Sequence, residues 1–347
     1  VLITIGPSCD DAMRLYGPFH AMAEMDTGMD HPTLLEFSEI LRWGENCVIP
    51  AFSSAAGARV YAQIKMAPTL GDHPSLDFRP MSEVSASLDT ERFYFADDSR
   101  PDDAPPVFGG RSFDIWEPDK GDYFGWARTL TLEELLAKRH RQVRLKSSAF
   151  HGLSGSWVED DSTMPWRHPR IAYSDITRAT DTRTMRPALV PGGVVLNNTA
   201  PYLVRRSGDE RTDAFVLGIL CSIPFDWAAR QTVELHVNPH VVRGFSVPDV
   251  DETNVLRERM VDVAGRLAAA DERFADWASA VGVSVGTMTD EQERQSAVAE
   301  LDALASLLYG LKWDDVVHVF ETFHRGWDYT ERLAAVQVHF DRWKDSA

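Results

Sequence analysis

Basic and hydroxyl side chains gather in the middle of the sequence, between Lys138 and Arg206. This stretch holds 12 Lys and Arg against 5 Asp and Glu, a local charge of +7, so the rest of the chain carries −25 of the formal net charge of −18. A cationic stretch on an acidic body is typical of a local site for a polyanion such as nucleic acid, because phosphate groups need nearby cations. A charge run is also typical of a solvated surface, and both interpretations stay open at this point.

Two parts of this stretch have residue types suited to DNA contacts. The first, KRHRQVRLK, could track a phosphate backbone. The second, RHPRIAYSDITRATDTRTMR, interleaves arginines with Ser, Thr and Asp, which hydrogen-bond phosphates and base edges. The candidate DNA-binding residues are Lys138, Arg139, Arg141, Arg144, Lys146, Arg167, Arg170, Thr177, Arg178, Thr182, Arg183 and Thr184. Alternatively, several of these arginines pair with Asp175, Asp181 or acids elsewhere and are structural.

No sequence motif predicts a catalytic residue or a bound metal. Ser222 to Phe225 (SIPF) differs at one position from the base-gripping turn of adenine methyltransferases, but no glycine-rich cofactor loop precedes it, and a turn that breaks a buried helix is the simpler interpretation. His236 and His240 have the spacing of a helical metal pair, but Pro239 lies between them and the flanking residues resemble a strand. The segment EPDK, residues 117–120, lacks the partnering acid of a nuclease. We therefore expect no metal and no cofactor in this chain.

Composition predicts a globular chain of about two domains. Of the 347 residues 44% are hydrophobic and 10% aromatic, enough for a sizeable core. No run of 18 apolar residues predicts a membrane span, and the N-terminus has neither an initiator Met nor a signal peptide, which suggests a fragment. Three distant cysteines, Cys9, Cys47 and Cys221, favour a reducing cytoplasm over a disulfide scaffold.

The hydropathy pattern predicts an α+β fold with a mixed sheet and a C-terminal helical bundle. A polar, proline-rich stretch near Pro105 suggests a boundary after a helical, connecting segment, residues 1–104. Short β-like runs then follow, ending with ELHVNPHVV, and one helical passage between Phe215 and Arg230 breaks at Pro224. These runs predict an α+β domain over residues 105–250. Apolar residues spaced by three and four then predict a helical region over residues 251–347.

Several longer stretches resemble one known family. The stretches occur in the same order as in that family, and they are FRPMSEVSASLDTERFYF, PVFGGRSFDIWEPDKGDYFGWA, HPRIAYSDITRATDTRTMRPALVP, LNNTAPYL, LGILCSIPFDWAAR and ELDALASLLYGLKWDDVVHVFETF. Together they resemble the C-terminal half of type IIG-like restriction-modification DNA adenine-N6 methyltransferases, including those of the BREX and DISARM phage-defence systems. The resemblance covers most of the chain from about residue 75 onward.

This resemblance implies a bacterial, cytoplasmic, DNA-binding target recognition domain. In that family an N-terminal domain binds S-adenosylmethionine and methylates adenine, and the C-terminal half reads double-stranded DNA. We therefore expect this chain to recognise double-stranded DNA beside a methyltransferase catalytic domain or subunit, with S-adenosylmethionine bound there and other defence-system subunits as further partners. Two alternatives stay open: a protein-interaction module that docks a partner subunit through its acidic surface, and an intact enzyme whose catalytic site is unrecognised.

Overall fold

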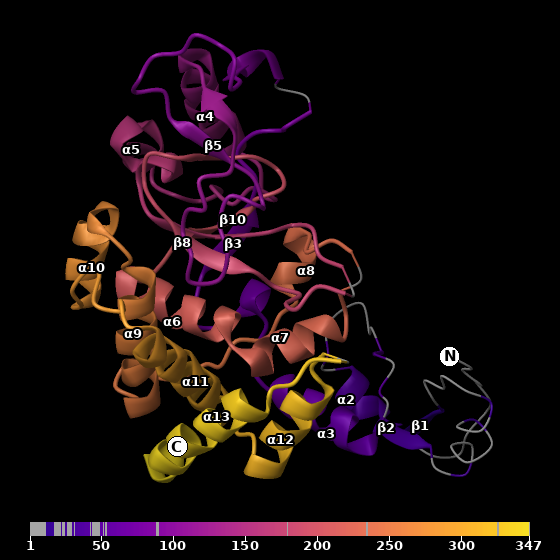
Figure 1. The fold of residues 1–347 in the computed structure, drawn as a ribbon. Coiled ribbons are helices and arrows are strands. Elements are labelled where there is room, and N and C mark those ends of the chain that lie inside the picture. The colour runs from indigo at the N-terminus through magenta and orange to yellow at the C-terminus, as the bar shows by residue number, and fades with distance from the viewer. Residues whose placement is uncertain are drawn as a thin grey trace.

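The computed structural model contains two four-stranded sheets (Figure 1). The structure describes residues 12–16, 22, 25, 30, 32–41, 43, 49–50, 52 and 54–346, except 88, 89, 179, 234 and 325. The first sheet is antiparallel and has the order β3 (Phe78–Met81), β10 (Tyr202–Arg205), β7 (Arg170–Tyr173), β8 (Pro187–Val190). The second has the order β4 (Phe93–Tyr94), β6 (Tyr123–Ala127), β5 (Pro106–Phe108), β9 (Val195–Leu196), and its β5–β9 pair is parallel. A separate hairpin joins β1 (Ala12–Leu15) to β2 (Thr33–Glu36).

The first sheet is buried on both faces. Along β7, Ile171 and Tyr173 enter the large core shared with the helices, whereas Ala172 between them enters a smaller core with Phe108 and Phe150. Side chains alternate between the two faces of a strand, so a continuously apolar strand can pack against two layers at once. The sequences of the central strands therefore consist mostly of apolar residues.

Helices surround these sheets, and their C-terminal members form a bundle. Before and within the sheets lie α2 (Phe37–Ile40), α3 (Ala55–Ile64), α4 (Thr129–Gln142) and α5 (Gly155–Glu159), with short turns of 3-10 helix at Leu70–Asp72, Thr90–Arg92, Asp161–Thr163 and Pro165–Arg167. After them lie α6 (Glu210–Cys221), α7 (Ile223–Arg230), α8 (Pro239–Arg243), α9 (Val255–Ala268), α10 (Ala275–Val281), α11 (Glu291–Leu308), α12 (Trp313–Thr322) and α13 (Thr330–Trp343), with 3-10 turns at Glu272–Phe274 and Lys344–Ser346. This confirms the predicted α+β fold with a C-terminal helical bundle.

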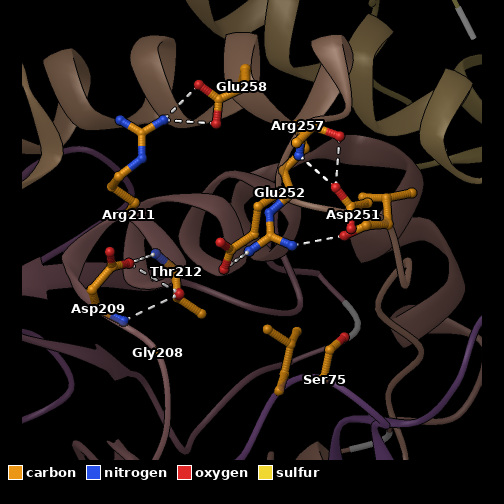
Figure 2. Close-up of polar contacts among 12 residues, drawn as sticks. Ser75, Gly208, Asp209, Arg211, Thr212, Asp251, Glu252, Arg257 and Glu258 are labelled. Atoms are coloured by element: carbon orange, nitrogen blue, oxygen red, sulfur yellow. Dashed lines mark hydrogen bonds and ion pairs between the residues drawn. The ribbon is translucent and has the colours of Figure 1, made fainter.

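Figure 2 shows how the N-terminus of α6 is fixed. The Asp209 carboxylate accepts a hydrogen bond from Thr212 N at 3.1 Å, and the Thr212 hydroxyl accepts one from Asp209 N at 3.3 Å, a reciprocal capping box. Arg211 then donates to both oxygens of Glu258 on α9, at 2.8 and 2.7 Å. Because α6 is almost wholly buried, these contacts set the position of the helix on which the bundle packs.

One expectation about the elements needs revision, and the expected division into three parts stays a prediction. The segment ELHVNPHVV was expected to be a strand, but α8 begins inside it, because Pro239 occupies the first helical turn after the N-cap Asn238. In addition, strand pairing crosses the boundary expected near residue 104, since β3 pairs with β10 and β4 with β6. That boundary does not separate two sheets, and the threefold division of the chain stays a prediction.

Over the described residues, no single helix is long and apolar enough to cross a membrane, and one pair, α6 and α7, reaches that composition only together and is bent by 60° at the junction.

Candidate nucleic-acid interface

Arg139 is a structural residue rather than a DNA contact. Its side chain is fully buried at the end of α4, where Nη1 donates to Thr163 Oγ1 and Nη2 to the carbonyl oxygen of Asp160, both at 2.8 Å. Its guanidinium carbon also lies 5.0 Å from the ring centre of Trp157. The residue links α4 to α5, and because its side chain is buried it is not available to contact DNA.

Arg170 is likewise buried, on β7 between the two sheets. It donates to Glu83 Oε2 at 2.9 Å and to the carbonyl oxygen of Val194 at 3.0 Å. Glu83 also accepts from Leu196 N at 2.7 Å. Burial raises the pKa of Glu83, and the charge of Arg170 opposes that rise. This ion pair joins the sheets and cannot face a duplex.

Asp226 on α7 gathers the polar groups of the loop between β7 and β8, residues 174–186, which we call the β7–β8 loop. Its fully buried carboxylate accepts from Arg183 Nε at 2.6 Å, Thr184 N at 3.1 Å and Met185 N at 2.7 Å. Arg183 also donates to the carbonyl oxygen of Cys221 at 2.7 Å. Thr184 itself is buried, and Arg183 and Thr184 therefore hold the loop rather than contact a ligand.

The tip of the β7–β8 loop, by contrast, is exposed. Asp181 closes a tight turn there: its carboxylate accepts from Arg178 N at 2.9 Å, and its own N–H donates to the Arg178 carbonyl oxygen at 2.9 Å. Arg230 of α7 donates to the Asp181 carbonyl oxygen at 2.8 Å. The side chains of Arg178 and Thr182 are exposed, and within the described part of the chain Arg178 makes no ion pair. Thr177, at the base of the loop, is buried.

The last turns of α4 and the segment after it carry the other candidate cations. Within the helix, Lys138 donates to the carbonyl oxygens of Ser82 and Glu83, at 3.1 and 2.6 Å, and Arg141 pairs with Glu134. Beyond the helix, Arg144 and Lys146 are exposed and have no carboxylate partner among the residues that the structure covers. Arg167, the remaining candidate, is exposed and pairs with Asp161.

Ion pairs neutralise most of the positive charge of the 138–206 stretch. Most arginines of the 138–206 stretch meet carboxylates that lie outside it in the sequence; these pairs are Arg141–Glu134, Arg170–Glu83, Arg183–Asp226, Arg186–Asp114, Arg205–Glu210, Arg205–Asp213 and Arg206–Asp77. The alternative in which arginines are structural fits the buried pairs of Arg170 and Arg183, whereas Arg141, whose side chain is 62% exposed, stays a candidate. Three candidates, Arg144, Lys146 and Arg178, remain as exposed cations without an ion pair in the described residues.

These three cations occupy two separate places. Arg144 and Lys146 follow α4 at one end of the molecule, whereas Arg178 lies on the loop held by α7 near the helical bundle (Figure 1). Among the described residues no hydrogen bond or ion pair joins Arg144 or Lys146 to Arg178, so these candidates lie on two surfaces.

The motifs that were set aside as catalytic have structural positions. Ser222 is the N-cap of α7, and its hydroxyl donates to the Ile219 carbonyl oxygen at 2.7 Å. The imidazole Nδ1 of His236 lies 3.1 Å from Asp175 Oδ2, and Asp119 of EPDK pairs with Arg273. Among the described residues no group of three or more His, Cys, Asp or Glu is arranged to hold a metal.

The cysteines add no chemistry that the structure resolves. Cys221 is a free thiol at the end of α6, and burial raises its pKa. A buried thiol with a raised pKa is a poor nucleophile. Cys9 and Cys47 lie outside the described residues.

Sequence reasoning missed the two carboxylates that organise the site, Asp226 and Glu83. Each lies more than 40 residues from the arginine it pairs with. Asp226 lies in α7, within the apolar segment LCSIPFDW, and a lone acid in a buried apolar segment indicates a buried partner.

Comparisons with known proteins give structural neighbours only. No family model matches the chain, and no curated protein matches it. Among solved structures, the type IIG restriction endonuclease BpuSI is similar with a TM-score of 0.38 and 12% identity, over 74% of this chain and 34% of that one. The type IIL restriction-modification enzyme MmeI, solved with DNA, is similar with a TM-score of 0.35 and 14% identity, over 90% of this chain and 41% of that one. The chain thus spans well under half the length of either restriction-modification enzyme.

Proposed function

We propose that this chain is a sequence-specific recognition module for double-stranded DNA that works beside an adenine-N6 methyltransferase of a restriction-modification or phage-defence system. The observation that carries the proposal is the β7–β8 loop, which a buried network around Asp226 holds in place while Arg178 and Thr182 stay exposed at its tip. The loop lies within one of the stretches that resemble the methyltransferase family, residues 168–191.

Hydrogen bonds that hold the described residues of this loop support a base-reading role. An arginine that donates two hydrogen bonds to the O6 and N7 atoms of guanine discriminates by about 1–3 kcal/mol, but only if its backbone is already in place. The turn between Arg178 and Asp181 and the anchor at Arg230 supply that order. Thr182 adds a hydroxyl that can donate to or accept from a neighbouring base or phosphate.

Arg144 and Lys146 are proposed to contact the phosphate backbone. Both are exposed and lie on the segment after α4, without an ion pair among the described residues. Phosphate contacts position a protein on DNA without reading sequence, and each adds to the salt dependence of binding. The two surfaces would thus divide positioning and reading between them.

Methyl transfer is assigned to a separate domain or subunit that binds S-adenosylmethionine. The glycine pair after β5 is closely packed, because a Cβ at Gly110 would lie 2.6 Å from the Thr199 carbonyl oxygen. The pair also leads into a turn rather than a helix.

A base-by-base competition assay tests the reading role. Arg178→Ala should relax discrimination at one base pair by about 1–3 kcal/mol and leave the other positions unchanged. Lys344→Ala, an exposed lysine at the far end of α13, is the matched control and should change nothing. Equal discrimination at every position by Arg178→Ala and the parent protein would refute the assignment of this loop.

Docking of a partner protein is a second candidate function. The side chains of Leu34, Leu41 and Met66 are 61%, 71% and 63% exposed around β2 and α3. Exposed apolar groups that gather on one surface favour a protein interface. If the chain fails to bind DNA, sedimentation of this chain with a purified methyltransferase subunit tests docking, and Leu34→Glu with Met66→Glu should abolish the complex.

A further inference from the structure

The turn after α4 carries one exposed leucine between two exposed cations. Leu145 is 55% exposed, and Arg144 and Lys146 on either side of it make no ion pair among the described residues. The sequence from residue 135 to residue 158 contains no Asp or Glu, so no acid of the neighbouring chain offsets these charges. The proposed phosphate contacts use the two cations and leave the leucine without a role.

Hydrogen bonds hold the backbone of this turn. Leu145 N donates to the Gln142 carbonyl oxygen, and the Leu145 carbonyl oxygen accepts from Ser148 N, both at 2.9 Å. The imidazole Nδ1 of His151 lies 3.2 Å from the Val143 carbonyl oxygen, so a contact also links the two ends of the turn. The leucine side chain is therefore displayed on an ordered backbone, although it packs into no core.

The neighbours of Leu145 distinguish it from other exposed apolar residues. Single exposed apolar side chains are common on proteins, and α4 has another, Leu130, which is 67% exposed. Leu130 lies in the first turn of the helix between two threonines, whereas Leu145 lies between two unpaired positive charges. An apolar side chain with a cation on each side is complementary to a ligand with an apolar centre and anionic edges.

Double-stranded DNA has this arrangement, because its stacked bases lie between two phosphate backbones. Consecutive Cα atoms are about 3.8 Å apart, so those of Arg144 and Lys146 are separated by at most about 7.6 Å. This span suits the minor groove, about 6 Å wide, better than the major groove, which is about 12 Å wide and admits a whole helix. Minor-groove proteins insert apolar side chains such as leucine between base pairs and kink the duplex. A lipid surface would need a larger apolar face than one leucine.

We infer that Leu145 is a wedge that enters the minor groove and partly unstacks one base step, while Arg144 and Lys146 contact the phosphates on either side. This inference rests on the proposed DNA-binding function and adds a second form of recognition to it. Pyrimidine–purine steps such as TA and CA unstack most readily, so the preferred duplex contains one of them where the turn lies. Arg178 then reads a base edge, and Leu145 reads how easily the duplex bends.

Energy transfer between dyes at the two ends of a duplex measures bending in the bound complex. On a duplex pool with a central TA step and random flanks, the parent protein should bring the ends together through a kink of about 20–90°. Leu145→Ala should bind about two- to tenfold more weakly, because both cations remain, and leave the duplex nearly straight. Leu145→Met keeps a long apolar side chain and should bend DNA as the parent protein does. Leu130→Ala, which removes the other exposed leucine of α4, is the matched control and should also bend DNA normally.

2-Aminopurine in place of the adenine of the TA step reports unstacking directly. Its fluorescence should rise with the parent protein and with Leu145→Met, and stay at the level of the free duplex with Leu145→Ala. The inference is overturned if Leu145→Ala bends and unstacks DNA as the parent protein does, or if Leu130→Ala loses the bend as well. Binding by the parent protein without bending also overturns it, but leaves the proposed DNA recognition standing. Absence of binding by the parent protein would overturn both.

Discussion

At the scale of single residues, a buried carboxylate decides what its arginine can do. Arg183 and Arg178 lie on the same loop, five residues apart, but Arg183 meets Asp226 and the carbonyl oxygens of Cys221 and Ser222, whereas Arg178 extends into solvent. An arginine whose donors are satisfied inside the protein has none left for a ligand. Exposure therefore separates a structural arginine from a binding one.

Replacing Arg183 should damage the fold. Arg183→Ala leaves the Asp226 charge buried with two backbone donors, and the loss of one partner of a buried ion pair costs roughly 3–5 kcal/mol. Urea unfolding measures this cost. Arg178→Ala is the control on the same loop and should change the free energy of unfolding by about 0.5 kcal/mol or less. Equal stability of the two variants would contradict the structural role of Arg183.

Replacing Arg144 and Lys146 should act on DNA affinity alone. If both contact phosphates, the double variant Arg144→Ala with Lys146→Ala should weaken binding to all sequences alike and lower the slope of log affinity against log salt by about 2. Anisotropy titrations over a salt series measure the slope. A slope equal to that of the parent protein would mean that these cations do not meet DNA.

Among the helices and strands, the sequence predicted those that are marked by a local residue pattern. The helical passage from Phe215 breaks at Ser222, close to the expected Pro224, because proline fits the first turn of α7 and not the interior of a helix. The apolar spacing after residue 251 likewise predicted the bundle. The error at ELHVNPHVV arose because alternation of apolar residues outweighed the Asn238-Pro239 helix start. Local patterns conflict there, and the tertiary context decides.

The N-terminus of α6 gives an element-scale prediction. Gly208 has φ of +80°, and a Cβ there would lie 2.5 Å from the hydroxyl of Thr212, which belongs to the capping box. Gly208→Ala should therefore lower the free energy of unfolding by about 1–3 kcal/mol, through backbone strain and a disturbed cap. Gly155→Ala, at an open position at the start of α5, is the control and should be nearly neutral. Thermal unfolding of the two variants distinguishes the cases.

At the scale of the whole molecule, the charge count of a sequence segment proved a poor guide to its surface. The +7 stretch is real, but its arginines reach acids such as Glu83, Asp114 and Asp226, which are distant in the sequence. Composition could therefore predict a basic segment and the α+β class, but not which cations face solvent. Among the candidates, Arg170 and Arg183 could be recognised as structural only after folding had brought Glu83 and Asp226 near, since spacing along the chain carries no information about such pairs.

Stability against pH also belongs to the whole molecule. The pKa of Asp213 rises from 3.8 to about 7 in the folded protein, so the folded state holds a proton that the unfolded state releases. Stability is then unaffected by this group below about pH 4, falls as pH rises from about 4 to 7, and stays reduced above it. Asp213→Asn should remove this loss, on the order of a few kcal/mol, when urea unfolding is compared at pH 5 and pH 8. An equal pH dependence in both proteins would show that Asp213 titrates normally.

The recognition of double-stranded DNA is the central claim, and selection from a randomised duplex pool tests it most directly. The chain is titrated against the pool by fluorescence anisotropy at two salt concentrations, and the bound duplexes are recovered and sequenced. We predict binding that weakens steeply with salt and an enriched motif that loses one position in Arg178→Ala. No binding at either salt concentration would contradict the claim and favour the protein-docking function instead.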